Sequence, residues 1–186
     1  YAIILEPFGR NTAPAITLAA LKALEISKDP HLLILSSDHQ IIDINKFQLS
    51  IENSINFALQ NNLIIFGIPP TYPSTGYGYI KSEKKLDLNE FLPSKVDKFI
   101  EKPDEKTAKS LFKDKSYSWN SGMFLFKATS ILNEIKIFSP RVLKNCEKCL
   151  EKSTVDLDFL RLEEKSFKNC ENVSIDISVF EKTKKA

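Results

Sequence analysis

The segment Leu32-Leu33-Ile34-Leu35-Ser36-Ser37-Asp38-His39 decides the expected fold, because four consecutive apolar residues are followed at once by small and acidic ones. A run this short predicts a fully buried parallel strand over 32–37 rather than a helix. Ligands of open parallel sheets collect beyond the carboxyl ends of the strands. Asp38 is therefore expected in such a crevice, where one carboxylate can hold a Mg²⁺ ion that also binds phosphates. The alternative is that Asp38 caps a turn.

Strands and helices are expected to alternate along the chain, which predicts an α/β fold. Apolar runs and period-two patterns predict strands at 1–5, 63–68, 96–100, 118–126 and 174–180. Helical spacing and capping residues predict helices at 12–26, 47–60, 104–112, 131–137, 142–150 and 157–167. The polar stretch 81–93 is expected to be a loop or a hairpin. With 186 residues, the chain fits one domain.

The composition argues against nucleic-acid binding and against a membrane span. The net charge is only +2, and the lysines are spread along the chain rather than gathered in a basic stripe with aromatic residues. The apolar runs are shorter than a membrane span requires. Cys146, Cys149 and Cys170 cannot all pair, which favours a reducing cytoplasm. The spacing of Cys146 and Cys149 is that of half a zinc site, but a closed site needs four ligands.

Two loops contain candidate ligand-binding residues. Arg10 precedes the helix expected at 12–26, whose first N–H groups could bind the ribose or phosphates of a nucleotide. The alternative is a capped helix beside an exposed arginine. In the loop 69–80, Gly76 and Gly78 flank Tyr77, so the backbone could approach a ligand closely while aromatic rings wall the pocket. A plain turn between strands is the alternative.

Two further polar groups are expected near the same crevice. Pro103 ends the strand at 96–100 and places Glu101 and Lys102 beyond its carboxyl end. A carboxylate there can hold sugar hydroxyls, and an ammonium group can balance a phosphate. A surface ion pair is the alternative. Asn120 and Gly122 stand at the entrance of the strand expected at 118–126.

Five segments, taken in order, resemble mannose-1-phosphate guanylyltransferases, also called GDP-mannose pyrophosphorylases. The segments are 6–15, 37–39, 75–80, 99–104 and 119–126, and the likeness extends to 174–176 and 181–183. The resemblance implies a Rossmann-like three-layer sandwich of the nucleotide-diphospho-sugar transferase type, with a mixed, mainly parallel sheet. It also implies that 1–186 is one nucleotidyltransferase domain, without the N-terminal Gly-rich loop and the C-terminal closing segment of the family. A stretch without both is expected to have little or no transferase activity.

The resemblance implies transfer of GMP from GTP to mannose 1-phosphate, which gives GDP-mannose for polysaccharide biosynthesis, and pyrophosphate, with Mg²⁺ as the cofactor. The implied catalytic residues are Asp38, as the metal ligand, and Lys102. The implied nucleotide contacts are Glu6, Pro7, Arg10, Asn11 and Thr12. The implied contacts of the sugar phosphate are Gly76, Tyr77, Glu101, Lys102, Asn120, Glu181 and Lys182.

Two other functions stay open at this point: a pyrophosphorylase for another nucleotide sugar, and a catalytically silent domain that binds nucleotide sugars. Association into a homodimer also stays open. Some relatives fuse this domain to a C-terminal mannose-6-phosphate isomerase and are named for it. With only His31 and His39, this chain is not expected to build the zinc site of that isomerase.

Overall fold

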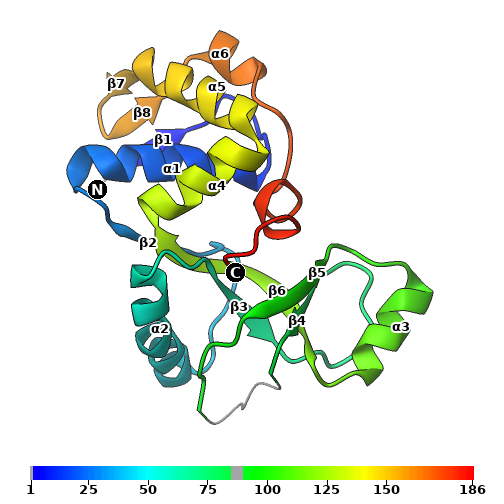
Figure 1. Ribbon diagram of the computed structural model, residues 1–186. Coiled ribbons are helices and arrows are strands. Elements are labelled where there is room, and N and C mark those ends of the chain that lie inside the picture. Colours follow the sequence, from blue (N-terminus) through cyan, green and yellow to red (C-terminus); the bar gives the residue numbers. More distant parts are fainter. Residues whose placement is uncertain (1, 85–89) are drawn as a thin grey trace. The chain divides into compact units, whose positions relative to one another are not determined.

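The computed structural model describes residues 2–84 and 90–186, and these residues form two compact units (Figure 1). Unit 1 comprises Tyr1–Pro30 and Ala128–Lys182, and unit 2 comprises His31–Lys127 and Thr183–Ala186. Each unit has its own sheet and its own helices. None of the helices in the described ranges combines the length and the apolar character that crossing a membrane requires.

Unit 1 consists of a small sheet and a group of packed helices. The elements are β1 (Ile3–Leu5), α1 (Thr12–Ile26), α4 (Ala128–Phe138), α5 (Pro140–Glu151), β7 (Thr154–Asp156), β8 (Phe159–Arg161), α6 (Glu164–Lys168) and the π-helix η1 (Asp176–Phe180). The strand order is β1-β8-β7, with β1 parallel and β7 antiparallel to β8. Helices α1, α4 and α5 pack against one another. Leu18, Ile131 and Val142 are buried among them.

The first helix begins where the sequence predicts. Asn11 is its N-cap, and the side chain of Asn11 accepts a hydrogen bond from the Thr12 N–H. Pro14 lies in the first turn, where the missing N–H of proline costs no helical hydrogen bond. Ala13 and Ala20 are fully buried, so small residues lie where other chain segments pack closest. The predicted helix at 12–26 is therefore confirmed.

Unit 2 is built around the long strand β6 (Figure 1). Its elements are β2 (His31–Ile34), α2 (Ile44–Leu59), β3 (Ile64–Ile68), β4 (Tyr79–Ser82), β5 (Val96–Ile100), α3 (Glu105–Lys113) and β6 (Tyr117–Lys127). Strand β3 pairs with one edge of β6, while β2 and β4 pair with the other, and β5 pairs with β4. Helix α2 packs on β6 and β3. Ala108 and Leu111 of α3 pack on Tyr79 and Trp119.

Strand β2 differs from the fully buried parallel strand expected over 32–37. It ends at Ile34, pairs antiparallel with β6, and is only half-buried, with Leu33 37% and Leu35 49% exposed. Strands β2 and β3 are both antiparallel to β6, which lies between them, so they run in the same direction without pairing. The α/β fold with mixed sheets is confirmed. Among the strand pairs within 2–84 and 90–186, however, only β1–β8 is parallel, rather than most of them.

Two other predicted elements are wrong. The helix expected at 157–167 is the β7–β8 hairpin followed by the short helix α6, because β8 pairs with β1 and Leu157 turns the chain with a φ of +55°. The strand expected at 174–180 is η1. Its buried Ile175 and Val179 are four residues apart, a spacing that also suits one face of a helix.

The other predicted helices and strands are present within a few residues of their expected bounds. Tyr1 of the strand expected at 1–5 and residues 85–89 of the loop or hairpin expected at 81–93 lie outside the described part. The described beginning of that second segment belongs to β4.

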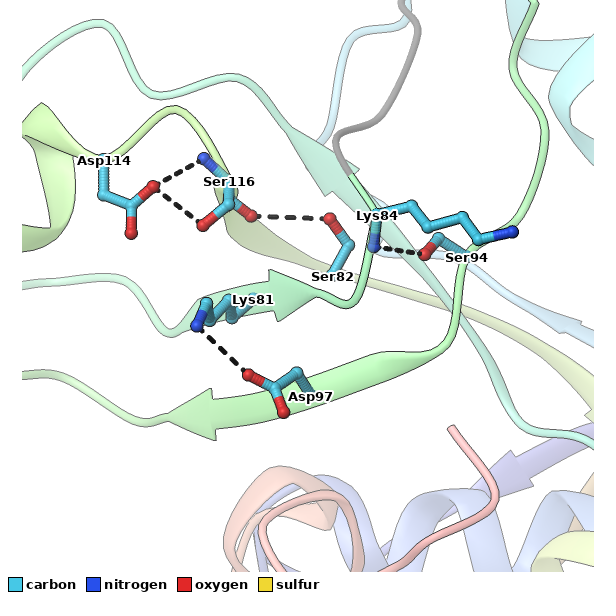
Figure 2. A network of polar contacts seen from close by, with 7 residues as sticks. All are labelled: Lys81, Ser82, Lys84, Ser94, Asp97, Asp114 and Ser116. Atoms are coloured by element: carbon cyan, nitrogen blue, oxygen red, sulfur yellow. Dashed lines mark hydrogen bonds and ion pairs between the residues drawn. The ribbon is translucent and has the colours of Figure 1, made fainter.

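Polar contacts fix β4 to its neighbours, as Figure 2 shows. The Lys81 ammonium group lies 3.2 Å from the Asp97 carboxylate of β5. The Ser82 hydroxyl donates a 3.4 Å hydrogen bond to the carbonyl of Ser116, whose own N–H and hydroxyl donate to Asp114 at 2.9 and 2.8 Å. Strand β4 is therefore held on both sides, which fixes the base of the loop that precedes it.

Candidate functional site

Unit 2 contains a cavity of about 350 Å³ at the ends of β3, β5 and β6. This volume lies in the range of small-molecule sites, roughly 300–1,000 Å³. The residues that line the cavity are His39, Ile68, Gly76, Tyr77, Gly78, Glu101, Trp119, Asn120, Ser121 and Gly122. Gly76, Tyr77, Glu101 and Asn120, which the sequence proposed as contacts of a sugar phosphate, are thus brought together in one place.

Asn120, one of the residues that line this cavity, is held in a fixed orientation. The Asn120 backbone N–H donates a 2.8 Å hydrogen bond to the carbonyl of Gly78. The Asn120 side-chain oxygen accepts a 3.1 Å hydrogen bond from the N–H of Gly122. Gly122 has a φ of +71°, a conformation that favours glycine. The glycine two residues after Asn120 therefore serves to aim the Asn120 carboxamide.

Glu101 and Lys102 follow β5 and form the ion pair that the sequence left as an alternative. The Lys102 Nζ atom lies 3.5 Å from Oε1 of Glu101. The Glu101 side chain is 14% exposed, whereas that of Lys102 is 64% exposed. Lys102 also has a φ of +42°, and strained backbone of this kind concentrates at ligand-binding sites. The ion pair therefore does not exclude a ligand-binding role for Glu101, because Glu101 also lines the cavity.

Gly78 makes room for the Glu101 carboxylate. A Cβ atom at position 78 would lie 2.6 Å from Oε2 of Glu101 and 3.3 Å from Cβ of Asn120. A carbon atom at 2.6 Å from that oxygen would force the Glu101 carboxylate to shift. The close approach of a carboxylate to bare backbone at Gly78 is therefore a built feature of the cavity.

Two aromatic rings, those of Tyr77 and Trp119, line the cavity, and the ring of Tyr72 packs on Trp119. The ring centroids of Tyr72 and Tyr77 each lie 5.0 Å from that of Trp119, at interplanar angles of 69° and 57°. The hydrogen bond with the Tyr72 hydroxyl, followed by electrostatic repulsion from it, raises the pKa of Tyr77. Both tyrosines therefore pack on the tryptophan.

The loop that carries Tyr77 is anchored by a buried tyrosine. The Tyr79 hydroxyl accepts a 3.0 Å hydrogen bond from the N–H of Ser74 and donates a 2.9 Å hydrogen bond to the carbonyl of the same residue. Tyr79 is fully buried and Ser74 is 8% exposed. The Ser74 hydroxyl in turn accepts a 3.1 Å hydrogen bond from the N–H of Gly76. One phenol therefore fixes the loop midway between Tyr72 and Tyr77.

We expect Tyr79→Phe to lower the free energy of unfolding by about 1–3 kcal/mol, because it leaves the buried N–H and carbonyl of Ser74 without a partner. Urea unfolding followed by the fluorescence of Trp119, the only tryptophan of the chain, measures the change within unit 2. Tyr117→Phe on β6 is the matched control and should unfold as the unchanged chain does. Equal unfolding curves for both variants would show that the Tyr79 hydroxyl does not anchor the loop.

Asp38 lies in an exposed turn after β2, and the next residue, His39, lines the cavity. The N-cap of α2 is Asp43, whose carboxylate accepts a 3.0 Å hydrogen bond from the Lys46 N–H, so Asp38 does not cap that helix. Within the described ranges, the structure shows no cluster of three or more residues that could hold a metal ion. A single exposed carboxylate still fits Mg²⁺, because phosphate and water oxygens can complete its octahedral coordination.

The expected nucleotide contacts lie in unit 1, and several of them also have structural roles. Burial raises the pKa of Glu6. The Arg10 guanidinium lies over the ring of Phe8 and donates a 2.8 Å hydrogen bond to the carbonyl of Lys168. The Thr12 hydroxyl accepts a 2.9 Å hydrogen bond from a backbone N–H of the segment before η1. The helix is therefore capped. Arg10, however, is half-buried, whereas the alternative given for this segment was a capped helix beside an exposed arginine.

The remaining expected residues are distributed between the units. Pro7 is exposed in unit 1, and Glu181 and Lys182 form an exposed turn directly after η1. Lys102 belongs to unit 2 and follows the cavity residue Glu101.

Sequence reasoning did not assign His39, Ile68, Ser121 or Trp119 to the site. Trp119 and Ser121 stand on either side of Asn120, so the motif itself contained the signal. Ile68 lies at the end of β3 and pairs with Trp119. Its place depends on the register between β3 and β6, which no local pattern reveals.

Comparisons with known proteins show the family to which the chain belongs. The family model described as "Nucleotidyl transferase" matches residues 1–165. A mannose-1-phosphate guanylyltransferase of Escherichia coli is 46% identical over 187 residues, which cover 99% of this chain and 40% of the relative. The alginate biosynthesis protein AlgA of Pseudomonas aeruginosa is 43% identical over 185 residues, covering all of this chain and 38% of the relative.

A solved structure has a similar fold. The crystal structure of mannose-6-phosphate isomerase from Helicobacter pylori superimposes with a TM-score of 0.86 at 35% identity, over 99% of this chain and 69% of that one. The chain spans about two fifths of the length of the curated relatives it matches. Because the family model covers most of the sequence, the chain belongs to the nucleotidyl transferase family.

Proposed function

We propose that the protein transfers GMP from GTP to mannose 1-phosphate and releases GDP-mannose and pyrophosphate. The observation that carries the proposal is the cavity in unit 2, where Gly76, Tyr77, Glu101 and Asn120 meet. Relatives that are 43–46% identical include a mannose-1-phosphate guanylyltransferase and an alginate biosynthesis protein, which supports the same chemistry and a role in polysaccharide synthesis.

The reaction needs no nucleophile from the protein. An oxygen of the sugar phosphate attacks the α-phosphorus of GTP, the new P–O bond forms, and the bond between the α-phosphorus and the bridging oxygen breaks. The electron pair of that bond leaves with pyrophosphate. Two anions must meet in line, so catalysis consists of positioning the substrates and of neutralising their charge.

Unit 2 provides the groups that would bind the sugar phosphate. The Glu101 carboxylate accepts hydrogen bonds from sugar hydroxyls, and the oriented carboxamide of Asn120 contacts the same ring. Lys102 binds the phosphate, because its exposed ammonium group is next to the cavity and is not buried with its carboxylate partner. The carboxylate thus recognises the sugar, and the ammonium group recognises the anion.

Other residues would bind the nucleotide and the metal. The proposed nucleotide contacts in unit 1 are Glu6, Pro7, Arg10, Asn11 and Thr12, and Glu181 and Lys182 are further proposed phosphate or sugar contacts. Asp38 would hold Mg²⁺, which when bound neutralises the phosphates of both substrates. Asp38 and Lys102 are the proposed catalytic residues.

The proposal places the protein in the cytoplasm, where nucleotide triphosphates are made and where its three buried cysteines stay free thiols, as they are in the structure. The Helicobacter pylori protein of similar fold is named for an isomerase activity. We do not propose that activity for this chain, whose two histidines cannot supply an isomerase zinc site. A fusion to such a domain and a homodimer are further proposals, and the sequence resemblance alone supports them.

A pyrophosphate-release assay on the full-length protein tests the nucleotide and the sugar. Mannose 1-phosphate is offered with GTP, ATP, UTP and dTTP, and then GTP is offered with glucose 1-phosphate. We expect the fastest release with GTP and mannose 1-phosphate. Faster release with another pair would identify a different pyrophosphorylase, and saturable binding of GDP-mannose without any release would identify a silent binding domain.

We expect Gly78→Ala to weaken binding of mannose 1-phosphate roughly tenfold, because the new methyl group displaces the carboxylate of Glu101. Titration of the 186-residue chain, followed by Trp119 fluorescence, measures the dissociation constant. Gly9→Ala is the matched control, since a Cβ atom at position 9 meets no atom within 4 Å. Unchanged affinity of the Gly78 variant would remove Glu101 from sugar recognition.

A further inference from the structure

We propose that Cys146 and Cys170 form a reversible disulfide when the protein is exposed to hydrogen peroxide, and that this bond joins α5 to the linker 169–175. The linker connects α6 with η1 (Figure 1), and Cys146 lies on α5. Both cysteines belong to unit 1. The inference is independent of the proposed function, in which no cysteine takes part.

The two thiols are already neighbours in the structure. The Sγ atoms of Cys146 and Cys170 lie 4.0 Å apart, which is within hydrogen-bonding distance for sulfur. An S–S bond of about 2.05 Å requires the sulfur atoms to approach by roughly 2 Å. The linker can supply this movement, because residues 171–174 belong to no helix or strand.

Polar contacts on both sides of the cysteine pair hold the linker against α5. The side-chain amide of Asn145 donates a 2.9 Å hydrogen bond to the carbonyl of Asn169. The Arg141 Nε atom lies 3.5 Å from Oε1 of Glu171. Each of these contacts joins α5 to a residue directly before or after Cys170. The neighbouring thiols are therefore one of three contacts that align the same two segments.

Cys170 is the more reactive thiol of the pair. The hydrogen bond from Cys146, and to a smaller extent the positive charge of Arg10, lower the pKa of Cys170. The same hydrogen bond, followed by burial, raises the pKa of Cys146. Cys146 is fully buried on a helix, whereas Cys170 is 3% exposed beside irregular backbone, which opens locally more readily. Peroxide should therefore oxidise Cys170 first, because the thiolate is the nucleophile.

The oxidation consists of two steps. The Cys170 thiolate attacks one oxygen of hydrogen peroxide, the O–O bond breaks, and hydroxide leaves with the electron pair, so that Cys170 becomes a sulfenic acid. The sulfur of Cys146 then attacks the sulfenic sulfur, the S–O bond breaks, and the hydroxyl group leaves as water with the Cys146 thiol proton. Overall, two thiols are oxidised to one disulfide while one peroxide is reduced to two waters. Thiol–disulfide exchange with a dithiol reverses the oxidation.

The linker that the disulfide would fix also contacts the start of α1. The Ile175 N–H donates a 2.9 Å hydrogen bond to the Thr12 hydroxyl. The Ala13 N–H donates a 3.1 Å hydrogen bond to the carbonyl of Val173. Oxidation should therefore restrain a segment that contacts both α5 and the first turn of α1.

Peptide mapping of the full-length protein tests the pairing, because trypsin cuts after Lys148 and so separates Cys146 from Cys149. The protein is treated with hydrogen peroxide, remaining thiols are alkylated, and the digest is analysed by mass spectrometry. We expect peptide 145–148 linked to peptide 169–182, with two hydrogen atoms fewer than the separate peptides, and release of both by dithiothreitol. Linkage of Cys149 instead, or no linked peptide, would overturn the proposal.

Two variants test what the disulfide does to the linker. Cys149→Ala is the matched control for Cys146→Ala, since each removes one buried thiol from α5. Peroxide should slow hydrogen exchange of the linker amides in the Cys149 variant and leave it unchanged in the Cys146 variant. The same response of both variants would contradict the proposal. The mapping uses the unchanged protein, so it decides the pairing even if a variant fails to fold.

Discussion

Replacement of Asp38 by asparagine should lower kcat for GDP-mannose synthesis by at least about 100-fold, because the amide removes the negative charge that would hold Mg²⁺ between two anionic substrates. The fold should be retained. Asp38 is exposed in a turn, and exposed substitutions away from caps and ion pairs change stability by no more than about 0.5 kcal/mol. Steady-state kinetics of the full-length protein at saturating GTP, sugar phosphate and Mg²⁺ measure the effect.

Asp43→Asn is the matched control for this change. Asp43 is an exposed aspartate five residues further on, and it caps α2, a role that asparagine also fills. The control should therefore keep both activity and stability. A kcat for the Asp38 variant close to that of the control would exclude Asp38 as the metal ligand.

Replacement of Lys102 by alanine should raise the KM for mannose 1-phosphate roughly 10- to 100-fold, which corresponds to losing a charge-assisted contact with phosphate. The KM for GTP should change far less. The Lys102 side chain is mostly exposed, so its removal leaves no cavity. Alanine and lysine both carry a Cβ atom, so a φ of +42° strains the backbone equally in the variant and in the unchanged chain. Initial rates with one substrate varied at a time give both constants.

Lys98→Ala removes an exposed lysine from β5, four residues earlier, and controls for the loss of one positive charge. It should alter neither KM. An equal rise of both KM values in the Lys102 variant would contradict its assignment to the sugar phosphate. Such a result would indicate a general electrostatic effect on two anionic substrates.

Four of the seven residues proposed as contacts of the sugar phosphate could be predicted to lie together, because they belong to short motifs at the ends of strands. Gly76, Tyr77, Glu101 and Asn120 line one cavity, as their motifs required. The position of Tyr72 could not be predicted, since its contact with Trp119 depends on how the loop folds back at Ser74. A contact this distant in sequence gives no periodic signal.

The errors in the fold have a common cause, namely partners that are distant in sequence. The apolar run at 32–35 cannot reveal that β6 lies beside β2, nor that Leu33 and Leu35 remain partly exposed. Residues 157–161 have a helical period, but pairing of β8 with β1 overrides it. By contrast, the capped helices α1 and α3 were predicted correctly, because Asn11 and Asp104 fix their starts locally.

The expected family is confirmed at the level of nucleotidyl transferases, and the proposed transfer of GMP can be measured directly. The most direct measurement follows labelled phosphorus in the full-length protein supplied with Mg²⁺ and mannose 1-phosphate. With GTP labelled at the α-phosphate, the account predicts that the label appears in GDP-mannose. With GTP labelled at the γ-phosphate, it predicts that the label appears in pyrophosphate. Label that stays in GTP while the protein binds both substrates would contradict the account.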